Sequence, residues 1–514
     1  MVRHSRSAFA DTNELWKRLP WKKFRRNLFR LQKRIYRATK DGDLRKVRSL
    51  QKLVMKSTSA MMLAIRQVTQ LNQGRKTAGV DGKKALNFKE RLALFFELEA
   101  HALNWTHLGL RSIPIFKKDG STRMLKIPTI RDRAWQCLAK YALEPAHEAT
   151  FHARSYGFRT GRSAHDAQRY VFEQLKKSAK VKEGQPPLNT QKRVIELDIK
   201  KCFDRISHKT ILNELIAPKG INDGIFRCLK SGVNPEFPEQ GTPQGGVVSP
   251  LLANIALNGI EETHTSVRYA DDMVLFLKPK DNAEKILNQI EEFLNERGMT
   301  INKEKTRITE VTKGFDFLGW ECKVCQDGRF RSFPSHDNIT AVRKKLKSII
   351  NDPRLSIEEK VKRLTPIYRG WRNYHKYCEL SGSKYSMWNL RYRANRKFNT
   401  KSRNLEEAIR LSEEAFPKVG YGLNQHTPVK GDKSPFDGDE VYWSKRKSKL
   451  YNGITSTLLS KQEFTCAFCG HKFVDDEKVH LHHKDGNHNN WKNDNLVAIH
   501  QTCHQLYHMG KSSD

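Results

Sequence analysis

Three aspartates at the ends of apolar, β-type segments constrain this chain more than any other feature. Asp198 lies near the end of the strand-like run Val194–Ile199, and Asp271 and Asp272 lie between two further apolar runs. Two apolar runs separated by Asp271 and Asp272 predict a β-hairpin with two adjacent carboxylates at its turn. Such carboxylates repel each other unless a cation compensates their charge.

Three clustered carboxylates suit a pair of divalent cations. Two metals about 3.5–4 Å apart can activate an attacking hydroxyl and neutralise a departing pyrophosphate in an in-line displacement. Mg²⁺ prefers carboxylates combined with substrate phosphates. We therefore expect Asp198, Asp271 and Asp272 to be catalytic Mg²⁺ ligands. The alternative for the tetrapeptide Tyr269–Asp272 alone is a solvated turn without chemistry.

The charge balance indicates a polyanionic partner. The 514 residues include 94 Lys and Arg against 56 Asp and Glu, a formal net charge of +38. This excludes an ordinary acidic cytosolic enzyme and favours nucleic acid. The length allows about three or four domains. The 9 cysteines, without a signal-peptide pattern, predict a reducing compartment, and no apolar run reaches the ~18 residues of a membrane span.

The composition changes along the chain. Residues 1–50 hold sixteen Lys and Arg beside apolar residues at helical spacing, which predicts a basic amphipathic helix; a merely solvated helix is the alternative. Residues 341–403 carry eighteen Lys and Arg against four acids and predict a basic helical domain. The Gly-, Pro- and Asp-rich segment Gly420–Gly438 is interpreted as a linker.

The last fifty residues are rich in metal-ligand side chains. Two pairs of them have a spacing that suits one tetrahedral structural Zn²⁺: Cys466, Cys469, His500 and Cys503. His504 and His508 are four residues apart and share one face of an expected helix. Cys322 and Cys325 have no second pair nearby, so we interpret them as packed thiols.

With these residues in view, the chain resembles the reverse transcriptases encoded by group II introns. Asp198 is similar to the acid of polymerase motif A, and Tyr269–Asp272 matches motif C. Gln240–Gly245 resembles motif B, in which glycines let the backbone approach the template and the incoming nucleotide. This resemblance implies the fingers, palm and thumb of a right-hand polymerase.

The resemblance also implies a set of nucleotide-binding residues. Phe203 stands where the family keeps an aromatic gate against a ribose 2′-hydroxyl, and would select deoxynucleotides. Lys117 and Arg123 resemble the residues of a finger hairpin that hold the triphosphate. Gln244 belongs to the motif B segment, and Lys305 to a segment similar to motif D.

Further blocks extend the resemblance over nearly the whole chain. Asn72–Gly74 resembles part of the family's N-terminal block, which points away from retroviral enzymes, and Ser155–Arg159 resembles a later block of the fingers. Phe317–Trp320 is similar to the hairpin that grips the primer. Tyr368–Tyr374 resembles the thumb, or domain X, through which family members bind intron RNA and assist its splicing.

The C-terminal histidines resemble those of an HNH nuclease of the ββα-metal type. In that family His483 would be the general base that activates water, and Asn495 would orient it. The remaining histidines would hold one divalent ion on the scissile phosphate: His482, His504 and His508. His500 stands where many relatives have a cysteine. The alternative is a zinc-stapled fold that binds DNA without cutting it.

Together these features predict an α+β multidomain chain, a right-hand polymerase with fingers, palm and helical thumb, followed by a ββα-metal HNH nuclease domain. The expected regions are a basic N-terminal extension with the first block (1–90), fingers and palm (91–334), thumb or domain X (335–403), a linker and DNA-binding region (404–455) and the nuclease (456–514).

The resemblance implies an RNA-directed DNA polymerase of a mobile group II intron, which binds its intron RNA to assist splicing and nicks target DNA to prime reverse transcription. The implied cofactors are Mg²⁺ in the palm, a divalent metal in the nuclease and structural Zn²⁺. The implied partners are intron RNA, target DNA and deoxynucleoside triphosphates, with no membrane, in a bacterial cytoplasm or an organelle. A splicing maturase with a vestigial polymerase and a defence-type reverse transcriptase are the alternatives.

Overall fold

The computed structural model describes the greater part of the chain. The described residues are 16, 19–116, 120, 122–177, 186–232, 236–382, 385, 387–400, 404–420, 426–451, 453–473 and 478–511. Among them, no helix combines the length and the apolar character that a membrane span needs.

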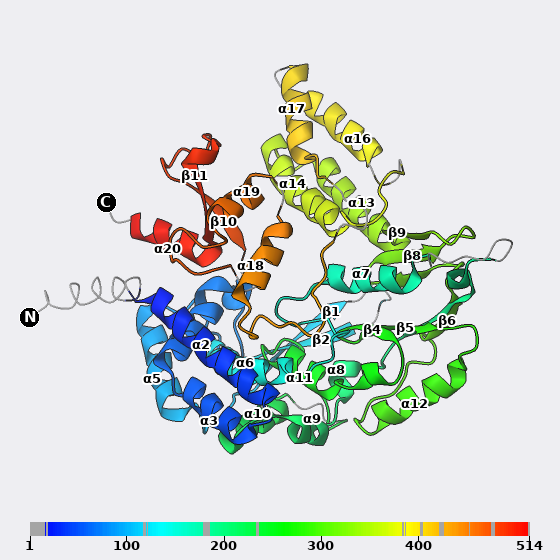
Figure 1. Cartoon of the computed structure of the whole chain (residues 1–514). Helices are drawn as coiled ribbons and strands as arrows, with labels where there is room; N and C mark the ends of the chain where they lie inside the picture. The colour runs from blue at the N-terminus through cyan, green and yellow to red at the C-terminus, as the bar shows by residue number, and fades with distance from the viewer. Residues whose placement is uncertain are drawn as a thin grey trace, which may run out of the picture.

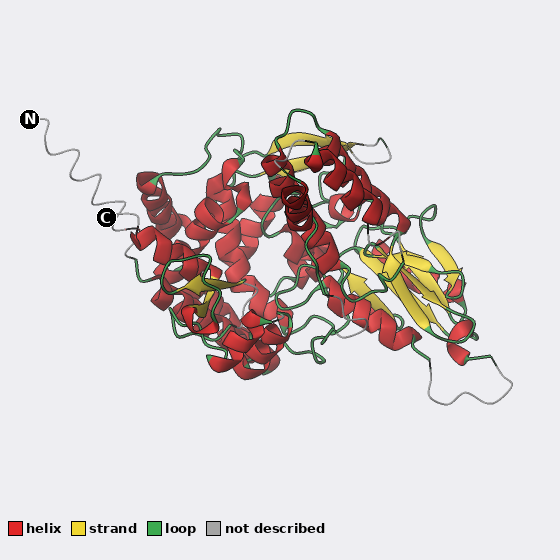
Figure 2. Cartoon of the chain, turned by 90° about the horizontal axis from the view of Figure 1, so that it is seen from above, coloured by secondary structure: helices red, strands yellow, loops and turns green. Residues whose placement is uncertain are grey.

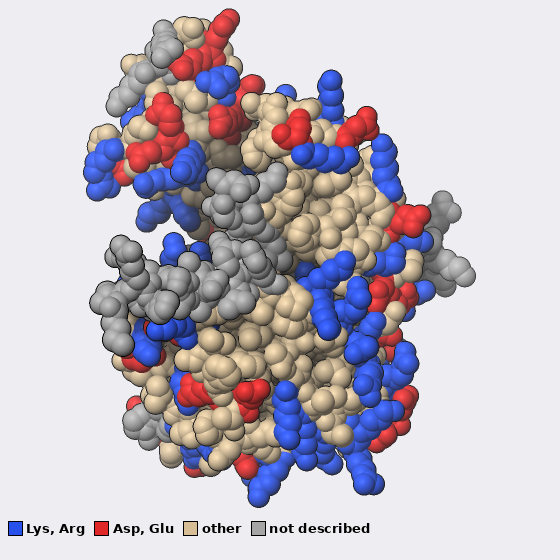
Figure 3. All heavy atoms as spheres, turned by 90° about the vertical axis from the view of Figure 1, so that its left-hand side faces the viewer, with Lys and Arg blue, Asp and Glu red and all other residues tan. Residues whose placement is uncertain are grey.

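The basic N-terminal segment forms the helix α2 (Trp21–Lys40), as its apolar spacing predicts. Its buried side includes Leu28, Leu31 and Ile35. Around it lies a helical layer of α3 (Leu44–Met55), α4 (Thr58–Arg66), α5 (Phe88–His101) and α6 (Ile130–Glu148). Lys and Arg side chains gather on the face shown in Figure 3, which includes these left-hand helices of Figure 1.

An antiparallel hairpin of β1 (Arg111–Phe116) and β2 (Thr122–Ile127) follows, with Arg111 opposite Ile127. Most side chains of β1 are exposed, so the hairpin is not part of a core. Beyond α6, the chain forms α7 (Ala164–Leu175), which contacts the first strand of the palm hairpin.

The palm is a four-stranded antiparallel sheet in the order β4-β5-β3-β6. Its strands are β3 (Arg193–Leu197), β4 (Ser266–Tyr269), β5 (Asp272–Leu277) and β6 (Arg307–Glu310). The helices of this region are α8 (Cys202–Arg205), α9 (His208–Glu214), α10 (Lys219–Lys230), α11 (Ser249–Ala256) and α12 (Ala283–Asn295). Single helical turns also occur: η1 (Gln67–Leu71), η2 (Gln73–Lys76), η3 (Leu188–Gln191), η4 (Ile260–Glu262) and η5 (Asn493–Asn495).

Strand alternation divides the palm side chains between two cores. Ile195 and Leu275 point into the core that contains the N-terminal helices. Val194 and Val274, their chain neighbours, point into the core that contains the thumb. Both faces of the central strands are therefore covered, which explains why β5 is an unbroken apolar run.

A second, three-stranded sheet leads into the thumb. It consists of β7 (Phe315–Phe317), β8 (Trp320–Val324) and β9 (Phe330–Pro334), and Cys322 is buried in its central strand. Figure 2 shows these strands and those of the palm gathered at one end of the molecule. The helices α13 (His336–Asn351), α14 (Ile357–Tyr374) and α16 (Trp388–Asn399) follow.

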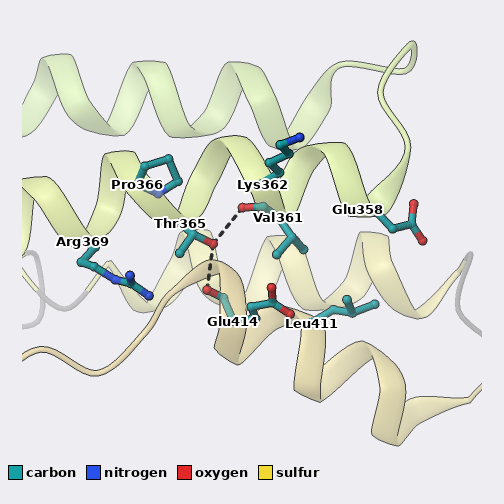
Figure 4. Close-up of a pocket in the computed structure, with 8 residues that line it drawn as sticks. All are labelled: Glu358, Val361, Lys362, Thr365, Pro366, Arg369, Leu411 and Glu414. Atoms are coloured by element: carbon teal, nitrogen blue, oxygen red, sulfur yellow. Dashed lines mark hydrogen bonds between the residues drawn. The ribbon is translucent and has the colours of Figure 1, made fainter. Parts of the chain in front are cut away.

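The helical thumb continues past residue 403, where the sequence places its boundary. α17 (Leu405–Ala415) contacts α14 and α16, and its Ala408, Leu411 and Ala415 belong to the thumb core. Thr365 Oγ1 donates to the carbonyl of Glu414 at 2.9 Å, which ties the two helices together beside a shallow cavity of about 500 Å³ (Figure 4).

The segment interpreted as a linker is packed over its described part, residues 426–438. His426, Ser434 and Phe436 are buried, as is Trp443 in the following helix α18 (Glu440–Lys449). The segment and α18 meet at a buried acid, Asp166 at the start of α7. It accepts hydrogen bonds from His426 Nε2 at 3.0 Å and Arg446 Nη2 at 2.7 Å.

The C-terminal part forms a β-hairpin and a helix. Its elements are α19 (Ile454–Lys461), β10 (Val479–His483), β11 (Leu496–His500) and α20 (Gln501–Lys511). Strand β10 pairs antiparallel with β11, and α20 contacts both strands. Arg25 of α2 donates to Thr502 Oγ1 at 2.9 Å, so this part also contacts the N-terminal helix.

Candidate functional site

The palm register brings the predicted acids together. Leu197 of β3 lies opposite Met273 of β5, so the next step along the pair sets Asp198 beside Asp272. The side chain of Asn302 donates to Asp198 Oδ2 at 2.8 Å, which holds this carboxylate in place. Asp271 occupies the turn between β4 and β5, as the hairpin prediction requires.

The three carboxylates interact electrostatically. The loss of surrounding water, followed by the negative charges of Asp271 and Asp198, raises the pKa of Asp272 to about 6. A cation bound here would relieve this repulsion, which is the property expected of a metal site. The donor set consists of oxygen atoms alone, which suits Mg²⁺.

A buried arginine supports the β4–β5 turn. Arg268 is wholly buried and donates to Glu261 Oε1 at 2.5 Å, to Asn254 Oδ1 at 3.0 Å and to the carbonyl of Ala270 at 3.0 Å. Ala270 has a φ of 61°, a left-handed conformation that costs energy for a residue with a Cβ. The arginine thus helps to hold a strained turn, a role that the sequence did not reveal.

The loop before α7 lies directly against the same turn. A Cβ on Gly157 would lie 2.2 Å from the backbone nitrogen of Ala270, closer than any real contact. Tyr156 N donates to the carbonyl of Arg268 at 2.9 Å. Residues Ser155–Arg159, identified only by resemblance, therefore form a backbone support for the catalytic hairpin.

The predicted sugar gate and motif B lie around the acids. Phe203 is half-buried, and its ring lies edge-on to Phe158, with 6.5 Å between the ring centroids. Phe158 is 50% exposed. Gln244 Nε2 donates to Asp204 Oδ1 at 3.0 Å, and the Gln244 carbonyl accepts from the backbone of β2. Motif B thus joins the finger hairpin to the palm.

Of the three basic residues predicted to contact the nucleotide, the structure describes the side chain of Lys305 alone. Lys117 lies outside the described residues, and for Arg123 only the backbone, in β2, is described. Lys305 is exposed in the turn before β6. Its neighbour Thr306 accepts a hydrogen bond from the backbone nitrogen of Asp198 through Oγ1 at 3.3 Å, so the turn adjoins the acids.

The structure brings together the four predicted zinc ligands. Cys466, Cys469, His500 and Cys503 are all buried, and their ligand atoms lie within 4.8 Å of one another. The Cys469 Sγ to His500 Nδ1 distance is 3.4 Å. Hydrogen bonds from the Cys469 and Cys503 thiols lower the pKa of Cys466, which favours the thiolate form that binds zinc. His500 therefore completes the group of four side chains.

The three predicted nuclease ligands also form one group. Ligand atoms of His482, His504 and His508 lie within 4.8 Å of one another, and the Nε2 atoms of His504 and His508 are 3.2 Å apart. Two histidines that the sequence interpretation missed lie nearby. His480 Nδ1 is 3.4 Å from His504 Nδ1, and His488 contributes to the lowered pKa of His504, which is about 4, chiefly because of burial.

His480 could have been found from its spacing, because it precedes His482 by two residues and so shares its face of β10. The third histidine of this strand, His483, instead contacts the rings of His488 and Trp491. Its Nε2 is buried without a hydrogen-bond partner in the described structure.

The predicted orienting residue supports a loop. The side-chain amide of Asn495 donates to Asp485 Oδ1 and to the carbonyl of Asn490, both at 2.9 Å, and accepts from the Asp485 backbone. Within the described residues it makes no hydrogen bond to the His483 ring. Its backbone carbonyl accepts from Lys484 N, so Asn495 fixes the chain directly after His483.

Comparisons with known proteins match successive parts of the chain. The N-terminal domain of reverse transcriptase matches residues 16–98, reverse transcriptase (RNA-dependent DNA polymerase) matches 115–322, and the group II intron maturase-specific domain matches 339–408. These matches confirm the predicted reverse transcriptase and maturase family.

Individual relatives agree with these domains. Maturase-like protein 1 of Euglena gracilis is 36% identical over 385 residues, 74% of this chain and 82% of that protein. Its namesake from Euglena longa is 33% identical over 75% of this chain and 83% of that protein. The group II intron-encoded protein LtrA of Lactococcus lactis subsp. cremoris is 25% identical over 58% of this chain and 62% of that protein. The chain belongs to the group II intron reverse transcriptase and maturase family.

Proposed function

We propose that the chain is the RNA-directed DNA polymerase of a mobile group II intron, which binds its intron RNA to assist splicing and nicks target DNA for target-primed reverse transcription. The observation that supports the polymerase part is the strand register of the palm. This register sets Asp198 beside Asp272, and Asp271 directly precedes Asp272 in the β4–β5 turn. The domain matches support the RNA-binding part.

The residues of the palm have distinct roles in this proposal. Mg²⁺ held by Asp198, Asp271 and Asp272 would supply activation of the primer 3′-hydroxyl and neutralisation of the pyrophosphate. Phe203, beside Phe158, excludes a ribose 2′-hydroxyl by its bulk. Gln244 positions the motif B backbone against the finger hairpin, and Lys305 would bring positive charge to the turn whose Thr306 bonds to Asp198.

The C-terminal part would cut DNA. Its cysteines, with His500, suit a closed structural zinc site because all four side chains are buried. A divalent ion on His482, His504 and His508 would supply charge neutralisation at the scissile phosphate. His483, whose buried Nε2 has no hydrogen-bond partner among the described residues, would accept the proton of the attacking water. The ββα arrangement of β10, β11 and α20 is consistent with this role.

A splicing maturase without mobility is the second candidate. The names of the two Euglena relatives favour it. The three acids of the palm, brought together by the register, favour the polymerase instead, because splicing assistance does not need clustered carboxylates.

The Asp271→Asn variant tests the polymerase assignment. The substitution removes metal-ligand charge from the palm and touches no thumb residue, so primer extension on an RNA template should be abolished while RNA binding persists. Each factor of ten corresponds to about 1.4 kcal/mol of barrier. The measurement is extension of a labelled primer by purified protein in Mg²⁺. Wild-type extension by this variant would exclude the assignment.

A further inference from the structure

One helix of the thumb carries an exposed aromatic pair. Trp388 and Tyr392 lie one turn apart on α16, with ring centroids separated by 5.3 Å and ring planes inclined by only 10°. The side chains are 62% and 52% exposed. The two rings therefore form a short parallel stack at the surface.

The fold of the helix does not depend on this stack. The opposite side of α16 buries Leu390, Ala394 and Phe398 in the thumb core. These residues recur at helical spacing and account for the packing of α16 against its neighbours. A large exposed aromatic surface on a second face is uncommon in a folded protein and indicates a binding site.

The charges of α16 itself indicate the kind of partner. The helix carries four basic residues and no acid: Arg391, Arg393, Arg396 and Lys397. Arg393 Nε donates to Asn351 Oδ1 at 3.0 Å, which links α16 to the end of α13. The neighbouring α13 adds Lys344 and Lys345, which are exposed. A partner with flat apolar faces and an anionic backbone fits this surface, and that combination describes a nucleic acid strand.

We propose that Trp388 and Tyr392 form a stacking platform for an unpaired base of the bound RNA, with the flanking arginines on its phosphates. The inference rests on the proposed RNA-binding function. The base must be unpaired because the faces of paired bases are already covered by their neighbours in the helix. Aromatic stacking accepts every base, so the platform adds affinity with little sequence preference.

Photo-crosslinking tests the location directly. The full-length protein is irradiated with a short oligouridine RNA that contains 5-iodouridine, and the linked peptide is identified by mass spectrometry. We expect crosslinks at Trp388 or Tyr392. Crosslinks confined to the palm and fingers would overturn the proposal.

Affinity measurements test the stacking contribution. The Trp388→Ala variant should bind the oligouridine about 5- to 150-fold more weakly than the wild type at one salt concentration, the range measured for one stacked base. Trp388→Phe should restore most of the affinity because it keeps a ring. The matched control is Phe96→Ala, since Phe96 is 56% exposed on α5 but lies beside Glu97 and Glu99.

The outcomes separate this inference from the function on which it rests. If the wild type binds the oligouridine and an intron RNA but Trp388→Ala binds both equally well, the platform is wrong and the proposed function stands. An equal loss of affinity for a blunt RNA duplex would also overturn the platform, because no unpaired base is then involved. If the wild type binds no RNA, both proposals fail.

Discussion

At the scale of single residues, the ionisation of Asp272 makes both the stability of the palm and its binding of Mg²⁺ depend on pH. Its pKa of about 6 lies above the ordinary value, so the metal-free protein binds a proton there more readily than the unfolded chain does. Ionisation of Asp272 above about pH 6 therefore opposes folding, and a bound cation removes this penalty. Mg²⁺ and the proton compete for the same carboxylate.

We expect Mg²⁺ to raise the Tm of the wild type more at a pH well above 6 than at a pH below 6, because the Asp272 carboxylate is already ionised in the first case, whereas Mg²⁺ must displace a proton in the second. Primer extension at limiting Mg²⁺ should fall as the pH decreases through this value and recover when Mg²⁺ is increased. Thermal unfolding and extension assays across pH measure the two effects. The Asp272→Asn control should show a Mg²⁺ response that is weaker and independent of pH; an equal response in both proteins would contradict the assignment.

At the scale of elements, the catalytic hairpin depends on the loop that carries Gly157. Any side chain at this position meets the backbone of Ala270, and neither backbone segment can move freely, because Tyr156 and Arg268 are hydrogen-bonded to each other. The β4–β5 turn is therefore placed by a segment more than a hundred residues earlier in the chain.

Gly157→Ala should lower primer extension by about 10²-fold, because a shift of about 1 Å in reacting groups has this effect. The measurement is the extension rate at saturating template and nucleotide. Gly420→Ala is the control, since a Cβ at this position meets nothing within 4 Å, and it should leave the rate unchanged. Extension by Gly157→Ala at the wild-type rate would show that the loop does not position the turn.

At the scale of the whole molecule, the polymerase and the C-terminal part are in contact. The described residues 426–438 and α18 pack against α7 through Asp166, and Lys33 of α2 pairs with Glu440 at 2.6 Å. The two candidate sites can still act separately, because the strands that carry the palm acids and the C-terminal hairpin pack into different cores.

His483→Ala tests this separation. It removes the proposed general base and leaves His482, His504 and His508 in place, so nicking of the second DNA strand by the ribonucleoprotein should fall by about 10²–10⁴-fold. Extension of a supplied primer and splicing assistance should persist. The rates of nicking and extension are measured on the same preparation. Normal nicking would mean that the histidine roles are misassigned, and loss of extension would mean that the docked C-terminal part influences the palm.

RNA binding should depend steeply on salt. Residues 341–403 carry a net charge of +14, and their contacts with phosphates release condensed counterions. We expect log Kd to rise with log salt with a slope of roughly 0.7 to 0.9 per phosphate contacted. Titrations of a structured intron RNA and a scrambled control over a series of KCl concentrations measure the slope. A nearly flat dependence for both RNAs would exclude an electrostatic interface.

Much of the molecule follows from local sequence patterns. The apolar spacing of residues 21–40 predicts α2, the apolar runs beside Asp271 and Asp272 predict the hairpin, and the two Cys and His pairs identify the cluster around Cys466. These features can be predicted from the sequence because the spacing of apolar residues, the position of a turn and the spacing of ligand-type side chains all depend on residues close together in the chain.

Tertiary structure alone decided the features that join distant segments. Arg268 became a support of the β4–β5 turn only through Glu261 and Asn254, and the Gly- and Pro-rich segment packs against α7 through the hydrogen bond from His426 to the buried Asp166. Composition cannot predict such contacts, since a buried charge selects its partner by proximity in space. The sequence by itself singled out the three palm acids and the two groups of Cys and His side chains, because their spacing is local; the fold decided what holds them in place, because their supports come from distant segments.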